Sequence, residues 1–129
     1  MMTDDQRLQD YCERIDGVKK YISEHIDEPL TREALADVAG FSIPHFHRIF
    51  TAQIGENIAS YIRRVRMERA GRKLRMGAVD ITEVALAAGY DTHAAFSKAF
   101  KQHFGLSPSE FRQLNCNTAT QILMKGKLQ

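Results

Sequence analysis

The chain has 129 residues, 43% of them apolar and 26% charged, which is enough for the core of one domain or two very small lobes. Its two cysteines, Cys12 and Cys116, are too few for a disulfide framework, so a reducing compartment is expected. Because there is no secretory segment and no long apolar run, we expect a cytoplasmic protein without a membrane partner.

The formal net charge of +2 divides unevenly along the chain. Residues 1–40 contain 5 Lys/Arg and 10 Asp/Glu, whereas residues 41–129 contain 13 and 6. A basic body of this kind attracts a polyphosphate such as nucleic acid. A solvated helical surface rich in arginine gives the same counts, so charge alone leaves both interpretations open.

The first predicted element is an amphipathic helix over residues 5–27. Apolar residues recur at helical spacing from Leu8 to Ile26, and the turn before Pro29 ends the pattern. Two shorter helices follow. Thr31 and Gly40 are typical of the start and end of one. Ser42 and Gly55 are typical of the start and end of the second short helix.

A long basic helix is predicted over residues 58–76, ended by Gly77. At about 100° per residue, its apolar residues change face midway. One cluster is Ile58, Tyr61, Ile62 and Val65, and the other is Met67, Ala70 and Leu74. This change indicates a connector whose two halves serve two different lobes.

Three further helices complete the pattern. The sequence from Asp80 to Glu83 resembles a capping box, and Gly89 ends that short helix. Another helix runs to Phe104 before Gly105. Ser107-Pro-Ser-Glu is a strong start signal for the last one.

The predicted fold is all-α, with about seven helices and no convincing strand. It comprises two helix-turn-helix subdomains, 5–57 and 77–115, a linker helix, 58–76, and a polar tail, 116–129, expected to be poorly ordered.

The two subdomains are copies of one unit. The segment "VAGFSIPHFHRIF" at residues 38–50 is echoed by "AAGYDTHAAFSKAF" at residues 87–100. Each copy reads as a short helix, a turn containing glycine and a second helix, which is the helix-turn-helix arrangement.

The second helix of each copy is predicted to have one core face and one outward face. Phe46 and Phe50 lie on the core face of the first, and Phe96 and Phe100 on that of the second. Small, polar and basic groups remain outward, as a helix entering the major groove needs. They are Pro44, His45, His47, Arg48 and Thr51, and in the second copy His93, Ala94, Ala95, Ser97, Lys98 and Lys101. A bundle of two merely packed hairpins is the less favoured alternative.

The long helix sets the distance between the copies. Its roughly 19 residues span about 28 Å, close to one DNA turn of about 34 Å. Two reading helices of one monomer are therefore expected to enter successive major-groove segments. Of the many basic residues on this helix, Arg63 and Arg66 are favoured as phosphate contacts.

The segment "ALAAGYDTHAAFSKAFKQHFGLSPSEFR", Ala85 to Arg112, resembles the signature of the AraC/XylS family of bacterial transcription regulators. The similarity covers about residues 8–114, and in length the chain is closest to the small MarA, SoxS and Rob type. The resemblance implies a seven-helix, two-lobed fold that binds an asymmetric promoter site as a monomer. It also implies activation through RNA polymerase, and association with the nucleoid when bound.

The resemblance implies that two sets of residues contact DNA bases. The first reading helix would use Pro44, His47 and Arg48, and the second would use His93, Ala94, Ser97 and Lys98. Pro44 replaces a large base-contacting side chain of the small relatives, and Ala94 and Ala95 lack their hydrogen-bonding groups. The DNA sequence that those relatives recognise therefore does not transfer to this chain. Readout is expected to rest on Arg48 and on DNA shape.

Other kinds of chemistry are less favoured. His45 and His47 diverge by about 200° on a helix and lack further ligands for a metal site. No catalytic arrangement and no cofactor motif is found, so no enzyme activity is expected. Two alternatives to a stand-alone activator stay open. One is the DNA-binding portion of a longer, effector-responsive regulator, and the other is an interaction module that contacts polymerase through the acidic N-terminal helix.

Overall fold

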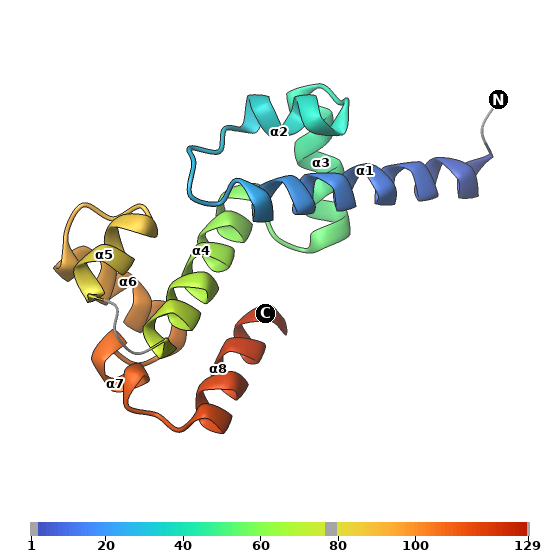
Figure 1. The fold of residues 1–129 in the computed structure, drawn as a ribbon. Helices are drawn as coiled ribbons and strands as arrows, with labels where there is room; N and C mark the ends of the chain where they lie inside the picture. The colour runs from blue at the N-terminus through green and yellow to red at the C-terminus, as the bar shows by residue number, and fades with distance from the viewer. Residues whose placement is uncertain (1–2, 77–79, 129) are drawn as a thin grey trace. The chain divides into compact units, whose positions relative to one another are not determined.

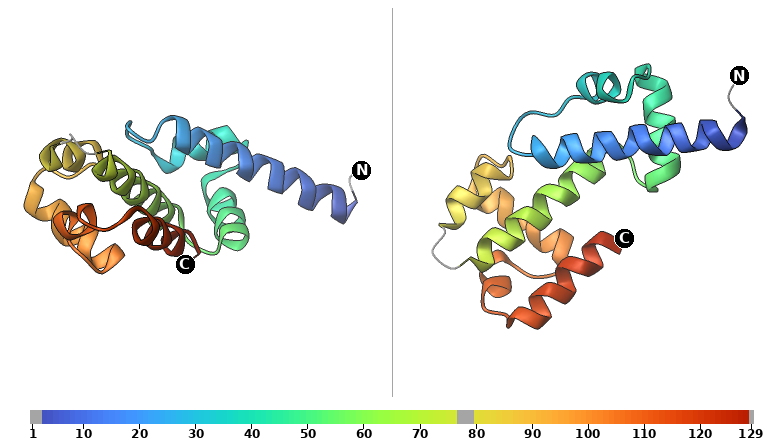
Figure 2. Two further views of the ribbon diagram at one scale, coloured as in Figure 1. Left: turned by 60° about the horizontal axis from the view of Figure 1, so that its bottom comes forward. Right: turned by 45° about the vertical axis from the view of Figure 1, so that its right-hand side comes forward.

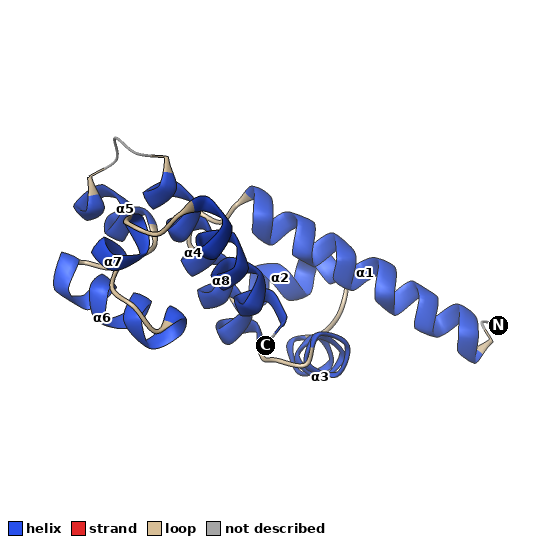
Figure 3. Ribbon diagram, turned by 90° about the horizontal axis from the view of Figure 1, so that it is seen from below, coloured by secondary structure: helices blue, strands red, loops and turns tan. Residues whose placement is uncertain are grey.

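The computed structural model describes residues 3–76 and 80–128, with side chains in the second range up to residue 124. Helices and their connections make up all of the described chain, and no strand occurs in it (Figure 3). The helices are α1 (Asp4–Glu24), α2 (Arg32–Ala39), α3 (Ile43–Ile54), α4 (Ile58–Arg75), α5 (Ile81–Ala87), α6 (His93–Phe104), α7 (Pro108–Arg112) and α8 (Cys116–Leu128) (Figure 1). The predicted all-α class is confirmed. None of the described helices is both long and apolar enough to cross a membrane.

The chain divides into two compact units, Met1–Ile62 and Arg63–Gln129, so the division falls inside α4. The change of apolar face predicted for this helix is present. Ile58 and Ile62, in its first turns, are buried in unit 1. Met67 and Leu74, further along, are buried in the core of unit 2. A single helix therefore contributes to two separate cores. Gly77, the predicted breaker, lies outside the described residues.

Unit 1 is built on α1, which packs against both α2 and α3 (Figure 1). Ile15, Val18 and Ile22 of α1 are almost fully buried. Leu8 is 60% exposed, although the periodic pattern predicted it for the same face. The first turns of α1 extend beyond the residues that form the core.

Polar caps fix the predicted helix starts. The side-chain oxygens of Thr31 and Ser42 accept hydrogen bonds from the backbone N–H groups at the third positions of α2 and α3. Ser107 and Glu110 form the expected capping box. Asp80 caps α5 as predicted, but it accepts from the N–H of Thr82, two residues on.

The turn between the two helices of each copy depends on glycine. Gly40 has φ +74° and Gly89 has φ +94°, in the left-handed region where a Cβ is strained. The equivalent conformation at both turns supports the predicted duplication of the helix-turn-helix unit.

Unit 2 has an aromatic core from α6 and α7. Phe96, Phe100 and Phe111 are each 0% exposed. The ring of Phe100 lies 5.6 Å from that of Phe96 and 5.5 Å from that of Phe111, centroid to centroid.

The prediction of a poorly ordered tail is wrong for Cys116–Leu128, which form α8, and the helix count of about seven becomes eight in the described chain. α8 lies beside α6 (Figure 2). Asn115 caps it through the N–H of Thr118, at 2.8 Å. Ala119 is buried, and Leu123 packs on the core, at helical spacing. Gly71 admits this contact, because a Cβ built there would lie 2.9 Å from Cδ2 of Leu123.

Candidate nucleic-acid interface

The exposed surface of α3 includes residues from its first turn and its centre. Pro44, His47 and Arg48 are exposed, while Phe46 and Phe50 on the opposite face are buried. Neither His47 nor Arg48 has a hydrogen bond or ion pair through its side chain with any described residue. Their polar groups are available to an external partner.

Two residues predicted to face outward on α3 are partly turned into unit 1. The ring of His45 packs 4.7 Å from that of Phe41 and 5.7 Å from that of Tyr11. The hydroxyl of Thr51 is buried and has no hydrogen-bond partner among the described atoms. The prediction for His45 missed this because Tyr11 of α1 packs against α3, and the α3 sequence by itself does not reveal that contact.

The corresponding surface of α6 is smaller in side-chain volume. His93, Ala94, Ala95 and Lys98 are exposed, and Ser97 is half-buried. The side chain of Lys98 has no hydrogen bond or ion pair within the described chain. It follows the buried Phe96 by two residues, as Arg48 follows Phe46. Each copy of the motif therefore presents an unpaired cation at the same register.

Lys101 is exposed but is not electrostatically isolated. Its charge acts on Glu110, whose pKa is lowered from its ordinary value of 4.5. The main cause of the lowered pKa is the hydrogen bond from the Ser107 backbone N–H, followed by the bond from the Ser107 hydroxyl and then the charge of Lys101. Lys101 is thus close enough to Glu110 for the two charges to interact.

The two arginines predicted to contact phosphate differ in their surroundings. Arg63 is exposed and has no ion pair with the described residues. Arg66 is half-buried, and its Nη1 lies 3.9 Å from the position of a Cβ at Gly89. Arg66 therefore lies beside the turn of the second motif, and Arg63 is the better candidate for a contact with DNA.

Sequence reasoning missed Arg14, which supports the equivalent turn in unit 1. Its Nη1 donates to the carbonyl oxygens of Ala39, at 3.0 Å, and Gly40, at 3.3 Å. Its Nε pairs with Asp10 at 3.0 Å, and the guanidinium lies 5.0 Å from the centroid of the Phe41 ring. A cation at the carboxyl end of α2 complements both the helix dipole and the free carbonyl groups. The i, i+4 spacing of Asp10 and Arg14 is the one feature of the sequence that could have drawn attention to Arg14.

Replacing Arg14 with alanine should lower the free energy of unfolding of the protein by about 1 kcal/mol, because two charge-assisted hydrogen bonds to partly exposed carbonyls are lost. Urea denaturation followed by circular dichroism measures this change. Arg7→Ala is the matched control, since Arg7 is an exposed residue of α1. Equal stability of the two variants would contradict the assigned contact.

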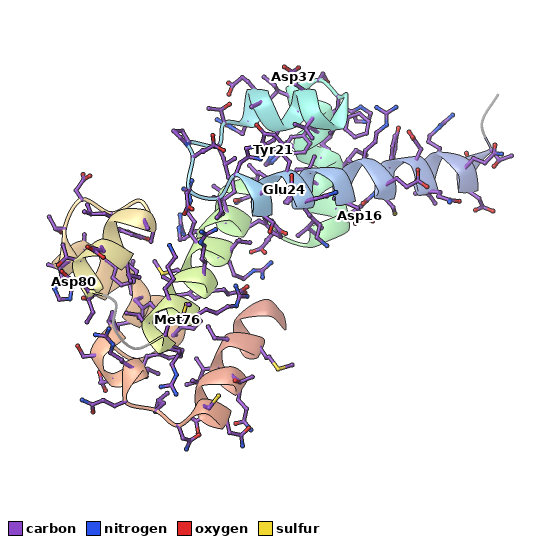
Figure 4. The ribbon with its side chains drawn as sticks, in the orientation of Figure 1. Asp16, Tyr21, Glu24, Asp37, Met76 and Asp80 are labelled. Atoms are coloured by element: carbon purple, nitrogen blue, oxygen red, sulfur yellow. The ribbon has the colours of Figure 1, made fainter. Side chains whose placement is uncertain are left out.

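Acidic groups are exposed on α1 and α2 of unit 1. Asp16 and Glu24 project from α1, and Asp37 projects from α2 (Figure 4). All three are exposed. Arg48, the unpaired cation of α3, therefore lies in a unit that is not uniformly basic.

The arrangement of the described side chains offers no metal centre, because no three His, Cys, Asp or Glu of the described residues gather as ligands. Cys12 and Cys116 are both exposed free thiols. Unit 1 also contains a pocket of about 610 Å³ between α2, α3 and the start of α4, with His47 in its wall.

Comparison with known proteins identifies a helix-turn-helix domain over residues 35–114. The chain is 31% identical over 102 residues to the uncharacterized HTH-type transcriptional regulator YbfP of Bacillus subtilis, covering 79% of this chain and 35% of YbfP. It is 32% identical over 93 residues to the regulatory protein SoxS of Salmonella typhimurium, covering 72% of this chain and 87% of SoxS. The chain thus spans about a third of the length of the first relative and most of the second.

Two solved structures resemble the fold. An AraC-type transcriptional regulator of Chromobacterium violaceum has a TM-score of 0.74 and 26% identity, covering 78% of this chain and 90% of that chain. The DNA-binding domain of AdpA, a global transcriptional factor solved in complex with a target DNA, has a TM-score of 0.69 and 27% identity. That match covers 77% of this chain and 89% of that chain.

Proposed function

Because the chain belongs to the AraC/XylS family of helix-turn-helix transcription regulators, we propose that it binds duplex promoter DNA sequence-specifically through α3 and α6. The observation that carries this proposal is the pair of exposed, unpaired cations at equal register in the two copies, Arg48 and Lys98. The structure of the AdpA domain with its target DNA supports the choice of ligand.

The two reading helices are proposed to contribute unequally to base recognition. Arg48 offers a planar guanidinium that can donate to both O6 and N7 of one guanine. Lys98 donates from a flexible ammonium group, which discriminates less sharply. Because Pro44, Ala94 and Ala95 offer no side-chain hydrogen bond, DNA shape supplies much of the remaining specificity.

Binding as a monomer is part of the proposal. One chain contains both reading helices, and α4 is a continuous helix of 18 residues, about 27 Å long. Successive major-groove segments on one side of the duplex are about 34 Å apart, and this is the spacing that the two reading helices of one bound chain would have to match. We further propose that the bound protein activates transcription through RNA polymerase, in the cytoplasm of a bacterium.

Arg63→Ala should weaken binding to all duplexes similarly and reduce the slope of log affinity against log salt by about one unit. The physical reason is that one phosphate contact fewer releases about one counterion fewer. Fluorescence anisotropy over a salt series measures the slope, with Arg7→Ala as a control for the loss of one positive charge. An unchanged slope in the Arg63 variant would remove this residue from the interface.

The direct test of the proposed function is selection of bound fragments from a random duplex pool, followed by anisotropy on the enriched sequence. We expect an asymmetric site with two recognised segments about one helical turn apart. A single-stranded oligonucleotide of the same sequence is the control. Failure to bind any duplex at low ionic strength would overturn the proposal.

A further inference from the structure

α8 is a part of unit 2 that the helix-turn-helix arrangement does not require. It follows the helix-turn-helix domain, which ends at residue 114. On their own, its 13 residues would form only a marginal helix in water. α8 therefore depends on its contacts with the rest of unit 2, and it is helical because it is docked there.

One face of α8 is docked and the other is open. Ala119 is buried, and Ile122 and Leu123 pack on the core of unit 2. These three positions follow i, i+3, i+4 spacing, so they share one face of the helix. Met124, the next residue, is exposed. Neighbouring residues of α8 thus differ sharply in their surroundings.

α4 offers two positions that receive α8 within unit 2. Gly71 leaves room for Leu123, since a Cβ at residue 71 would lie 2.9 Å from Cδ2 of Leu123. Glycine inside a helix is less favourable than alanine, and this close approach gives it a purpose here. Arg75, one turn further along α4, donates from Nη1 to the carbonyl oxygens of Arg112, at 2.9 Å, and Leu114. Arg75 therefore holds the connection that leads into α8.

α8 also packs against α6, the second reading helix. Phe96 and Phe100 of α6 are buried in the core on which α8 packs, whereas Ala94 and Lys98 stay exposed. α8 thus leaves the proposed reading surface of α6 open. Side chains that read a partner must be held within about 0.5 Å of the productive geometry by the residues that support them.

We propose that the docking of α8 positions α6 for base recognition, so that release of α8 weakens base preference in the DNA segment that α6 reads. This proposal rests on the proposed function. α8 is a positioning element, because it contacts α4 at Gly71 and also contacts α6, and so fixes the direction of α6 within unit 2. By thermodynamic linkage, docking that raises DNA affinity must itself be strengthened by bound DNA.

The docking is tested by a matched pair of variants of the full chain. Leu123→Asp and Met124→Asp add the same charge at neighbouring positions, one on the docked face and one on the open face. Leu123→Asp should speed amide hydrogen exchange over residues 116–128 about tenfold or more, because a carboxylate opposes burial and the undocked helix unfolds. Met124→Asp should leave this exchange unchanged. Equal exchange in the two variants would overturn the assigned docking.

The positioning role is tested on the enriched duplex. Base preference is the ratio of the affinities for this duplex and for a duplex with one recognised segment scrambled, and Lys98→Ala identifies the segment that α6 reads. In Leu123→Asp, preference in that segment should fall about fivefold, while preference in the segment read by α3 is retained. Met124→Asp should retain both. Full preference in both segments while residues 116–128 exchange rapidly would overturn the positioning role.

The comparison requires that α6 stays folded, so exchange over residues 93–104 is measured in the same samples. Leu123→Ala removes less contact and adds no charge, and it replaces Leu123→Asp if the latter unfolds unit 2. Loss of α6 structure in every variant that releases α8 would overturn the positioning role, because α8 would then act only as part of the core.

Linkage gives an independent readout in the unmodified protein. The enriched duplex should slow exchange over residues 116–128 by about the factor by which release of α8 weakens binding. Exchange that does not respond to bound duplex would overturn the coupling. Duplex binding by the unmodified protein is measured first. Its absence would overturn the proposed function, and the positioning role with it, whereas exchange in the free protein still decides the docking of α8.

Discussion

Replacing Phe100 with alanine is expected to destabilise unit 2 by about 3–5 kcal/mol. Its side chain is 0% exposed and contacts three other rings, those of Phe96, Phe104 and Phe111. Removing it deletes both buried apolar surface and the aromatic contacts, and neighbouring rigid rings fill such a cavity poorly. Because these rings come from α6 and α7, the variant should also lose DNA binding through α6.

Urea denaturation measures the effect of Phe100→Ala on the free energy of unfolding. Leu86→Ala is the control, since Leu86 is an apolar residue of the same unit that is 59% exposed. Its stability should change by about 0.5 kcal/mol or less. A Phe100 variant as stable as the Leu86 variant would show that the buried face of α6 is assigned wrongly.

Arg48→Ala is expected to weaken binding to the selected DNA site by about 1–3 kcal/mol and to relax the preference at one base pair. The guanidinium is exposed and has no partner among the described residues, so its donors are free for a base. Arg48→Lys should restore most of the general affinity but little of the base preference, because an ammonium lacks the planar fork of donors.

Anisotropy on the selected site and on single-base variants measures the loss for Arg48→Ala. Random duplex of the same length separates base recognition from charge attraction. An equal loss on random and selected duplexes would show that Arg48 contacts phosphate instead of a base. Arg7→Ala again controls for removal of one positive charge at a distance from α3.

The sequence predicted the helices well where local chemistry decides them. As expected, α2 begins after Thr31 and ends at Gly40, and α3 begins after Ser42 and ends at Gly55. Such caps act within a few residues, so their signals can be read from a short stretch of chain. The duplication was further evidence for the helix assignments, because the same pattern of residues occurs in both copies of the helix-turn-helix unit.

The errors lie where distant segments meet. α8 depends on burying Ala119 and Leu123 against unit 2, and the space at Gly71 that admits Leu123 lies about fifty residues away in sequence. The polar composition of the segment predicted disorder, but packing on an existing core outweighs weak intrinsic propensity.

The same limit applies to the candidate interface. His45 and Thr51 share the polar character of their neighbours, and ring contacts with Tyr11 of α1 and with Phe41 turn the ring of His45 inward. Arg14 donates hydrogen bonds to one turn and Arg66 lies beside another, and each turn is more than twenty residues away in sequence. The exposed residues Pro44, His47 and Arg48 needed only the helical period, and for these the outward facing is confirmed.

The division inside α4 has a consequence for protein engineering. Since Ile58 and Ile62 complete one core while Met67 and Leu74 complete the other, no cut through this helix yields two intact halves. In a chimera that takes one helix-turn-helix unit from a relative, each apolar face of α4 must come from the same protein as the core that it completes. Recombination at residue 57, in the short connection before α4, would preserve the helix but graft a foreign first turn onto unit 1.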